Sequence, residues 1–331
     1  MKKIRILHTS DIHLGTAFYA YGKRADILAH ELLDTFLNVI SAAKKYSADA
    51  LVICGDITDC GILDRTEQAA VNAKFAEISD IPVFLIYGNH DMDFNGSFPD
   101  NVHVFDRPAK FSLNGADIYG ASYKYRKIDF VPDNPDNINI VMRHGSLDEF
   151  PARLPESIDY AALGHFHSYS VNGRYVYSGM PMGRGFDEQG QPGFVIADIS
   201  KERTERTFVP AGARQFAEYD IDITNCAVYT EILDIIREKS LDKRNLYRFN
   251  LTGVKNCETH SGRLCAALNE EYFYAAVADK TKLPVDLESE IKKESLMGYF
   301  LKNAAAGGAD DETVRLGLSA LKGERIYTDE N

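Results

Sequence analysis

The sequence predicts an α/β fold built around a parallel sheet, because strand and helix patterns alternate over its first hundred residues. Three short apolar runs, at 4–7, 50–54 and 83–87, have the length and composition of buried strands. Between them, residues 24–46 carry apolar side chains at helical spacing, and residues 66–78 form a second helical segment. Strands that alternate with helices in this way form parallel sheets covered by the helices.

Length and composition narrow the class of protein. The chain has 331 residues, enough for one large domain and a smaller one, and its net charge of -12 argues against a protein that coats nucleic acid through a basic surface. The five cysteines are scattered without Cys-x-x-Cys spacing and are expected to be reduced thiols. No apolar stretch has the length of a signal peptide or a membrane span. We therefore expect a cytoplasmic protein with no membrane contact.

The first strand runs directly into a polar motif. Asp11 and His13 stand two residues apart, and in an extended chain this spacing puts a carboxylate and an imidazole on one face, where both can bind one ion. An isolated Asp-x-His is explained as well by a turn-capping aspartate and a surface histidine. His8 lies inside the strand pattern and is expected to be structural.

The second and third strands also end in polar residues after a glycine. Asp56 follows Gly55, and Asn89-His90-Asp91 follows Gly88. The carboxyl ends of parallel strands are where open α/β sheets build their sites. In such a site Asn89 can serve as a neutral oxygen ligand, His90 as a proton donor and Asp91 as the group that orients it. Taken alone, the four residues are also an ordinary turn.

The pattern of a strand followed by a histidine occurs twice more. Shorter strands are expected at 102–105, 110–113 and 117–121. A strand at 138–142 then leads to His144, and a strand at 160–163 leads to His165 and His167. The spacing of the last pair is that of two metal ligands, with an exposed strand end as the alternative.

Eight groups are therefore candidates for one site at the strand ends. They are five histidines (His13, His90, His144, His165 and His167) and three oxygen donors (Asp11, Asp56 and Asn89). Nitrogen and oxygen ligands without thiolate suit Mn²⁺, Fe²⁺ or Zn²⁺. Two such ions about 4 Å apart polarise a phosphoryl group and activate the water between them. Arg143, next to a candidate ligand, can contact a substrate phosphate or form a salt bridge.

The ordered motifs resemble those of the calcineurin-like metallophosphoesterases. They are Asp11-x-His13, Gly55-Asp56-x-x-Asp59, Gly88-Asn89-His90-Asp91, His144 and Gly164-His165-x-His167. Residues 9–15, and 177–188 leading into 193–199, are similar to the SbcD-like DNA-repair exonuclease branch. The resemblance implies a layered fold of central β-sheets flanked by helices. It covers roughly the first half of the chain.

The resemblance also implies roles for the matching residues. One metal would be held by Asp11, His13 and His167, the other by Asn89, His144 and His165, and Asp56 would bridge the two. His90 would be the general acid, paired with Asp91, which fixes its tautomer. The implied reaction is in-line attack by a metal-activated hydroxide on a phosphodiester, with Mn²⁺ as the first candidate metal. Asp59 would support the site as a turn or outer residue.

Two departures keep alternatives open. Asp91 stands where Ser/Thr protein phosphatases carry Glu, which argues against that activity. The segment between Asp91 and His144 is short for a repair nuclease, which favours smaller substrates. The first hypothesis is a nuclease subunit that hydrolyses phosphodiester bonds at DNA ends with an SMC-like ATPase partner of the SbcC type. The alternatives are a phosphodiesterase for nucleotides or small esters, and a weakly catalytic scaffold that binds DNA ends.

The pattern predicts three parts: a catalytic domain at 1–212, a small α/β capping-like domain at 213–283 and a helical tail at 284–331. The small domain shows strands at 218–223, 246–251 and 273–277 and helices at 228–239 and 261–271. It carries a basic cluster that either contacts DNA or forms a solvated face: Arg237, Lys239, Lys243, Arg244 and Arg248. The tail predicts two helices joined at Gly307-Gly308, which dock on an ATPase in the family or pack on their own chain. Family resemblance also suggests a homodimer.

Overall fold

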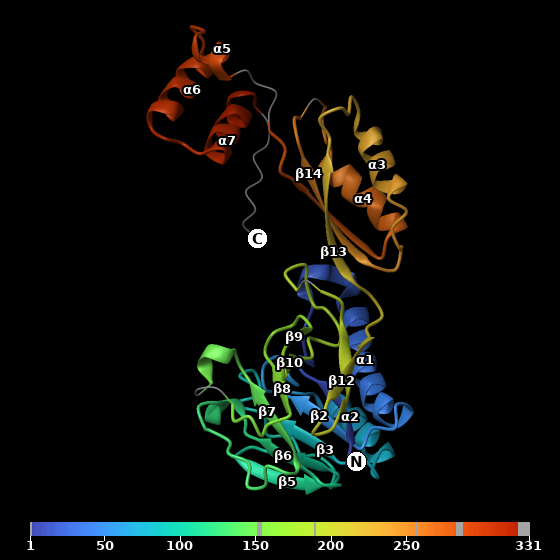
Figure 1. The fold of residues 1–331 in the computed structure, drawn as a ribbon. Helices are drawn as coiled ribbons and strands as arrows, with labels where there is room; N and C mark the ends of the chain where they lie inside the picture. Colours follow the sequence, from blue (N-terminus) through green and yellow to red (C-terminus); the bar gives the residue numbers. More distant parts are fainter. Residues whose placement is uncertain (1, 151–153, 189, 256, 283–286, 324–331) are drawn as a thin grey trace. The chain divides into compact units, whose positions relative to one another are not determined.

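The computed structural model of the chain describes residues 2–150, 154–188, 190–255, 257–282 and 287–323. The chain forms two compact units, Met1–Phe216 and Ala217–Asn331, which are described separately (Figure 1). The predicted division between a small domain and a tail falls at 283 and 284, outside the described residues, and stays a prediction.

The first unit contains a six-stranded sheet in the order β12-β11-β1-β2-β3-β4. Its strands are β1 (Ile4–Thr9), β2 (Ala50–Cys54), β3 (Val83–Ile86), β4 (Val102–Val104), β11 (Gly193–Ile199) and β12 (Thr204–Pro210). Strands β1 to β4 are parallel, as the alternating pattern predicts, with Leu7 opposite Leu51 and Leu51 opposite Val83. Two strands extend the sheet in the antiparallel sense, because β11 pairs with β1 and β12 with β11.

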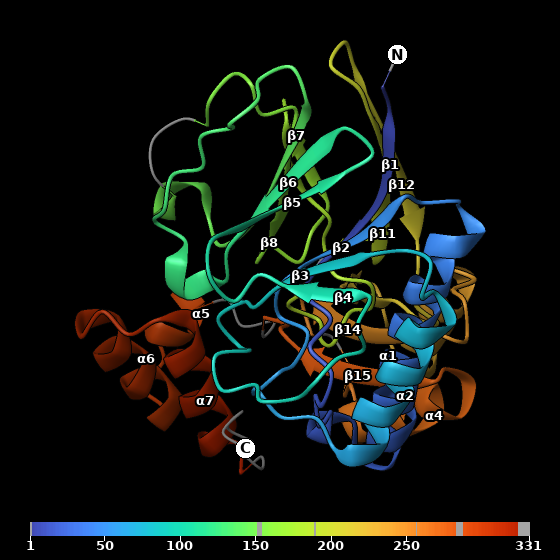
Figure 2. The ribbon, with the colours of Figure 1, turned by 90° about the horizontal axis from the view of Figure 1, so that it is seen from below.

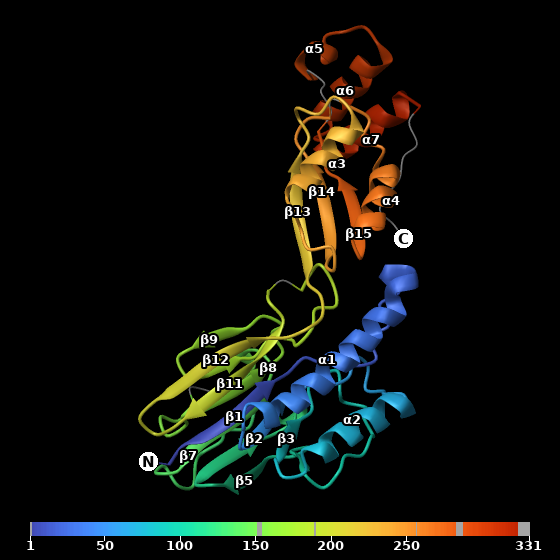
Figure 3. The ribbon, with the colours of Figure 1, turned by 90° about the vertical axis from the view of Figure 1, so that its right-hand side faces the viewer.

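Two helices lie side by side on one face of this sheet, α1 (Ala25–Lys45) and α2 (Arg65–Glu77) (Figure 3). The buried residues of α1 recur every three or four positions, as in Leu28, Leu32 and Phe36, which turns one stripe of the helix inward. A capping box starts α2, since Asp64 accepts from the Glu67 amide and Glu67 accepts from that of Asp64.

A second six-stranded sheet, in the order β5-β6-β7-β8-β10-β9, forms another layer (Figure 2). Its strands are β5 (Ala109–Leu113), β6 (Ala116–Gly120), β7 (Ile138–His144), β8 (Tyr160–Gly164), β9 (Ser170–Asn172) and β10 (Tyr175–Tyr177). The central strands β6, β7, β8 and β10 are parallel, and the edge strands β5 and β9 are antiparallel. Three short 3₁₀ helices occur in the loops: η1 (Tyr19–Arg24), η2 (Tyr123–Tyr125) and η3 (Leu147–Glu149).

The main core lies between the two sheets. It joins Ile6 and Val52 of the first sheet with Ile140 and Ala162 of the second. Because side chains alternate along a strand, the neighbouring residues point to the other face of each sheet. On the outer face of the second sheet, Val141 packs in a separate cluster with the loops that cover it. This two-sheet core with outer helices agrees with the layered fold that the resemblance implies.

The second unit is built on a sheet in the order β13-β14-β15, with two helices. Its elements are β13 (Phe216–Asp222), α3 (Tyr229–Glu238), β14 (Leu246–Thr252), α4 (Ser261–Glu271) and β15 (Tyr274–Asp279). Ile232 of α3, Phe249 of β14 and Leu264 of α4 meet in its core. Three arginines of the predicted basic cluster are paired with carboxylates of the same unit: Arg237 with Glu271, Arg244 with Asp242 and Arg248 with Glu218.

The C-terminal segment forms three helices where the sequence predicted two: α5 (Leu287–Ile291), α6 (Leu296–Ala306) and α7 (Asp311–Leu321). The break before α6 arises because Ser295 caps a new helix and its side chain accepts from the Gly298 amide. Helices α6 and α7 pack closely, since a Cβ at Gly317 would lie 2.0 Å from the ring of Phe300.

Across the described residues, none of the helices combines the length and the apolar character that crossing a bilayer requires. The five cysteines are free thiols, and Cys54 is buried beside the site described below.

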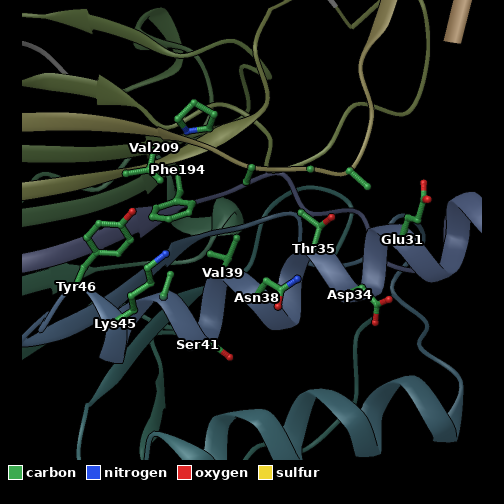
Figure 4. A pocket seen from close by; sticks show the side chains of 15 residues that line it. Glu31, Asp34, Thr35, Asn38, Val39, Ser41, Lys45, Tyr46, Phe194 and Val209 are labelled. Atoms are coloured by element: carbon green, nitrogen blue, oxygen red, sulfur yellow. The ribbon is translucent and has the colours of Figure 1, made fainter. Parts of the chain in front are cut away.

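A groove of about 720 Å³ runs between α1 and the strands β11 and β12 (Figure 4). Tyr46 and Phe194 meet edge to face at one end of it, and Glu31 and Asp34 line the other. The predicted site residues do not line this groove.

Candidate metal centre

The site is formed by loops at the carboxyl ends of strands from both sheets. Asp11 follows β1, Asp56 follows β2, Asn89 follows β3, His144 ends β7 and His165 follows β8. The first two loops continue to pair beyond their strands, because the Asp11 amide donates to the Gly55 carbonyl at 3.0 Å. The sheet topology therefore brings segments more than 150 residues apart to one place.

Four of the predicted site residues have a left-handed backbone. The φ angles are 55° at Asp11, 54° at His13, 51° at Asp56 and 106° at His165. Residues other than glycine adopt this conformation at a cost, and such strain concentrates at functional sites. The surrounding hydrogen bonds hold these loops in conformations that aim the side chains inward.

Two glycines allow the loops to approach this closely. A Cβ at Gly88 would lie 2.1 Å from the Asp56 carboxylate, and one at Gly164 would lie 2.0 Å from the Cys54 carbonyl. Neither position has room for a side chain, so the glycines of the sequence motifs are required by packing.

One group of donor atoms joins Asp11, His13 and His167, whose ligand atoms lie within 4.8 Å of one another. The Nε2 atoms of His13 and His167 are 3.3 Å apart. Nδ1 of His167 lies 2.8 Å from Glu188 Oε1, and Nδ1 of His13 lies 3.4 Å from Asp59 Oδ1. Both rings therefore turn Nε2 toward a shared point.

A second group consists of Asp11, Asp56 and His144, whose ligand atoms also lie within 4.8 Å of one another. His144 Nε2 lies 3.3 Å from Asp56 Oδ2 and 3.1 Å from Asn89 Oδ1, and its Nδ1 donates to the Cys54 carbonyl at 2.7 Å. The ring of His165 packs edge to face on His144, with centroids 5.4 Å apart. Asp56 Oδ2 is also 3.7 Å from His13 Nε2, so this carboxylate faces both groups.

The structure corrects the predicted pairing of His90 with Asp91. His90 Nδ1 lies 2.7 Å from the backbone carbonyl of Asp59, and that carbonyl accepts its proton. The Asp91 carboxylate is buried and accepts from the amides of Ile57, Thr58 and Gly88 and from the Thr58 hydroxyl. The prediction that Asp91 fixes the tautomer of His90 is wrong, because its side chain turns the other way and ties two loops together.

The two predicted roles of Arg143 are also wrong. Strand alternation places His144 on the inner face of β7 and Arg143 on the outer face, where it is 2% exposed. Its guanidinium donates to the carbonyls of Arg126 and Ile128 and lies over the rings of Phe130 and Phe150. Among the described residues it therefore forms no salt bridge with a carboxylate and does not contact the site.

Sequence reasoning missed a chain of charged groups behind the histidines. Arg184 donates to Glu188 Oε1 and, at 2.8 Å, to Asp59 Oδ1. Glu188 in turn contacts His167, and Asp59 contacts His13 and His90. Arg184 and Glu188 lie in the stretch 177–188, which resembled the repair branch without suggesting a role for either residue.

The electrostatics of the site favour positive charge at its centre. Burial lowers the pKa of His144, but the hydrogen bond and charge of Asp56 outweigh it and raise the value to about 9. The same contacts overcome the effect of burial on Asp56 and lower its pKa to about 2. Both shifts arise because a positive charge beside the Asp56 carboxylate is stabilised, as the charge of a bound cation would be.

The donor set fits two divalent cations. His144 and His167 have a hydrogen-bond partner at Nδ1, and Asp59 Oδ1 lies 3.4 Å from Nδ1 of His13, so the Nε2 lone pair of each ring is the one left to bind a metal. These lone pairs converge on carboxylate and amide oxygens without any thiolate, the donor set of Mn²⁺, Fe²⁺ and Zn²⁺. Lone pairs as close as those of His13 and His167 repel one another unless a cation or a proton lies between them.

Comparisons with known proteins agree with this geometry. The profile of the calcineurin-like phosphoesterase family matches residues 4–169, which include the strand ends described above. A DNA double-strand break repair protein Mre11 of Sulfurisphaera tokodaii is 29% identical over 203 residues, 52% of this chain and 51% of that protein. The SbcD component of the nuclease SbcCD of Escherichia coli is 26% identical over 58% of this chain and 64% of its own.

A third relative covers more of the chain. The Mre11 protein of Methanopyrus kandleri is 21% identical over 97% of this chain and 83% of its own length. By contrast, the match to the Sulfurisphaera protein spans about half of that relative. The family match covers half of the chain and contains all of the predicted ligands, so the chain belongs to the calcineurin-like phosphoesterase family.

Proposed function

We propose that the chain is a two-metal phosphodiesterase of the DNA-repair nuclease type, hydrolysing phosphodiester bonds at DNA ends. The observation that carries the proposal is the convergence of the His13, His144 and His167 Nε2 atoms on the carboxylates of Asp11 and Asp56. The names of its relatives, a break repair protein and a component of a nuclease, support DNA as the substrate.

The ligand assignment is the one that the resemblance implies; the group of Asp11, His13 and His167 matches its first ion, and the contacts of His144 with Asp56 and Asn89 support its second. Asp11, His13 and His167 would hold one ion, Asn89, His144 and His165 the other, and Asp56 would face both. When bound, two such ions, with Mn²⁺ as the first candidate, would polarise the phosphoryl group and lower the pKa of a water.

The chain's own residues supply the rest of the mechanism. His90 is exposed and donates from Nδ1 to the Asp59 carbonyl, so its Nε2 is the nitrogen that can hold a proton for the leaving oxygen. Its backbone amide donates to Asp56 Oδ1 at 2.9 Å, which ties the proton donor to the carboxylate facing both metal groups. A cavity of about 600 Å³ lies further along the same two loops, lined by Cys60 and Phe94, and none of the candidate ligands lines it.

We further propose an SMC-like ATPase of the SbcC type as partner of the C-terminal helices. The SbcD relative is by its name one part of a larger nuclease, which supports this assignment. On α6, Leu296 and Tyr299 leave 74% and 59% of their surface exposed, as expected of a helix that binds another protein. A homodimer stays a prediction.

A second candidate is hydrolysis of nucleotides or other small phosphodiesters. Two observations favour it: the net charge of -12, and the pairing of Arg237, Arg244 and Arg248 with carboxylates, which removes most of the basic surface available for a long duplex.

The test is an assay of the purified chain with Mn²⁺ on single-stranded DNA, duplex DNA and bis-p-nitrophenyl phosphate. We expect DNA hydrolysis that disappears in Asp56→Asn and persists in His30→Gln, a control on the surface of α1. Hydrolysis of the small ester alone would replace the nuclease proposal with the second candidate. Hydrolysis of none of the three would favour a scaffold that binds DNA ends.

A further inference from the structure

Arg184 and Glu188 lie outside the family match, which ends at residue 169, yet they contact the candidate metal centre. We infer that these two residues, together with Asp59, are positioning residues that orient His167, His13 and His90 as one unit. The inference rests on the proposed two-metal function and adds Arg184 and Glu188, which lie outside the family match, to the supporting role already expected of Asp59.

The first link fixes His167. Its Nδ1 lies 2.8 Å from Glu188 Oε1, and because a carboxylate only accepts, Nδ1 must carry the proton. That tautomer leaves the lone pair on Nε2, the atom 3.3 Å from His13 Nε2. Without Glu188 the ring would be free to rotate or to carry its proton on Nε2, which cannot then bind a metal.

The second link holds Glu188 itself. The Glu188 side chain is only 8% exposed, so its charge needs a partner. Arg184 supplies three contacts, from its backbone amide at 2.6 Å, from Nε at 2.9 Å and from Nη2 at 2.5 Å. This pairing aims one carboxylate oxygen at the guanidinium and at His167 together.

The third link connects the same arginine, through Asp59, to the rings of His13 and His90. Arg184 Nη1 donates to Asp59 Oδ1 at 2.8 Å. That oxygen lies 3.4 Å from His13 Nδ1, and the Asp59 carbonyl accepts from His90 Nδ1 at 2.7 Å. A single guanidinium therefore sits between two carboxylates, one beside His167 and one beside His13, and the backbone carbonyl of Asp59 accepts from His90.

An ion pair with no role at the site serves as a control, because its loss should affect stability but neither a histidine tautomer nor metal affinity. The pair of Arg214 with Glu31 is a matched control in the same unit, because its side chains are 17% and 19% exposed and its Nε contact is 2.8 Å. The contacts described for this pair join the two side chains to each other and involve no histidine of the site. Loss of a merely structural pair would lower stability without changing a histidine tautomer or the affinity for metal.

The experiment uses the full chain, with ¹⁵N-labelled histidine, as wild type, Glu188→Ala, Glu188→Gln, Arg184→Met and Glu31→Gln. Long-range ¹H–¹⁵N spectra of the metal-free proteins report the tautomer of each ring, assigned with His→Gln variants. Calorimetric titration with Mn²⁺ reports affinity, and circular dichroism checks the fold. Should Glu188→Ala fail to fold, Glu188→Asp replaces it, since the shorter side chain withdraws from His167 but keeps its charge.

We expect wild-type His167 to be protonated on Nδ1 and Glu188→Ala to shift it toward Nε2, with Mn²⁺ bound about 10- to 100-fold more weakly. Glu188→Gln should recover the tautomer through its amide oxygen. Arg184→Met should weaken Mn²⁺ binding about tenfold, and Glu31→Gln should leave it within about twofold.

An unchanged His167 tautomer in Glu188→Ala, with affinity within about twofold of wild type, would overturn the inference. A wild-type chain that binds no Mn²⁺ would instead overturn the proposed function. The tautomer of the metal-free proteins would then still decide whether Glu188 orients His167.

Discussion

The substitution Asp91→Asn tests whether Asp91 is a structural tie between loops or an orienting group for His90. The carboxylate accepts four hydrogen bonds, from the Ile57, Thr58 and Gly88 amides and the Thr58 hydroxyl, at 2.8 to 3.1 Å. Asparagine keeps one oxygen, which can accept two of these, and turns an NH₂ group toward the other donors.

The expected loss of unfolding free energy in Asp91→Asn follows from the two hydrogen bonds that are lost. Each bond to a buried charge contributes about 1.5 to 3 kcal/mol. Burial raises the pKa of Asp91 against the effect of its donors, so removing the charge relieves part of this loss. We expect a net decrease of about 3 kcal/mol in the free energy of unfolding, which for a unit of this size lowers Tm by roughly 6 to 12 °C.

The assay is thermal unfolding of wild type, Asp91→Asn and Asp93→Asn, monitored by circular dichroism. Asp93 is exposed on the same loop, and its variant should stay within about 0.5 kcal/mol of wild type. A Tm for Asp91→Asn within 1 °C of wild type, on the order of the measurement error, would refute the loop-tie argument.

Three further predictions follow from single residues. His90→Ala should still bind Mn²⁺ but lose about 10²- to 10⁴-fold in turnover of bis-p-nitrophenyl phosphate, because its Nε2 is the proposed proton donor; unchanged turnover would remove His90 from the mechanism. Burial lowers the pKa of His8 to about 3, so the unfolded chain binds a proton below pH 6.5 that the folded chain excludes. From pH 7 to pH 5 this group should cost about 2 kcal/mol of stability, and urea unfolding of His8→Gln should show that much less acid sensitivity than wild type; equal sensitivity would contradict it. Gly88→Ala should abolish hydrolysis and lower the free energy of unfolding by about 2 kcal/mol or more, because the new Cβ would lie 2.1 Å from Asp56 Oδ1. The control Gly262→Ala, in a helix with nothing within 4 Å, should stabilise the chain slightly, and equal effects of the two would rule out the steric explanation.

Sequence reasoning located the elements of the first unit well, because the apolar residues of each element form an uninterrupted run or recur at regular spacing. The apolar run at 50–54 corresponds to β2 residue for residue, and the helix expected at 24–46 is α1, Ala25–Lys45. The candidate ligands could be predicted for the same reason, since each lies at or just after the end of an apolar strand. The tail was divided differently because α5 ends at Ile291 and Ser295 caps a new helix, although the apolar pattern continues across this break.

The contacts behind the ligands could not be predicted in the same way. His90 and Asp91 are adjacent in sequence, but one side chain reaches the Asp59 carbonyl and the other the amides of Ile57 and Thr58, a choice made by the turn geometry. Glu188 lies 21 residues after His167 in a loop without periodicity, so no pattern links them. The position of Arg143 could have been predicted, because adjacent residues of a strand point to opposite faces and His144 faces the site.

Anomalous diffraction from crystals grown with Mn²⁺ tests the proposed two-metal centre most directly. The account predicts two manganese peaks roughly 4 Å apart, one beside His13 and His167, the other beside His144 and Asn89, with the Asp56 carboxylate between them. A protein that hydrolyses phosphodiesters with manganese absent from these histidines, or bound elsewhere, would contradict it.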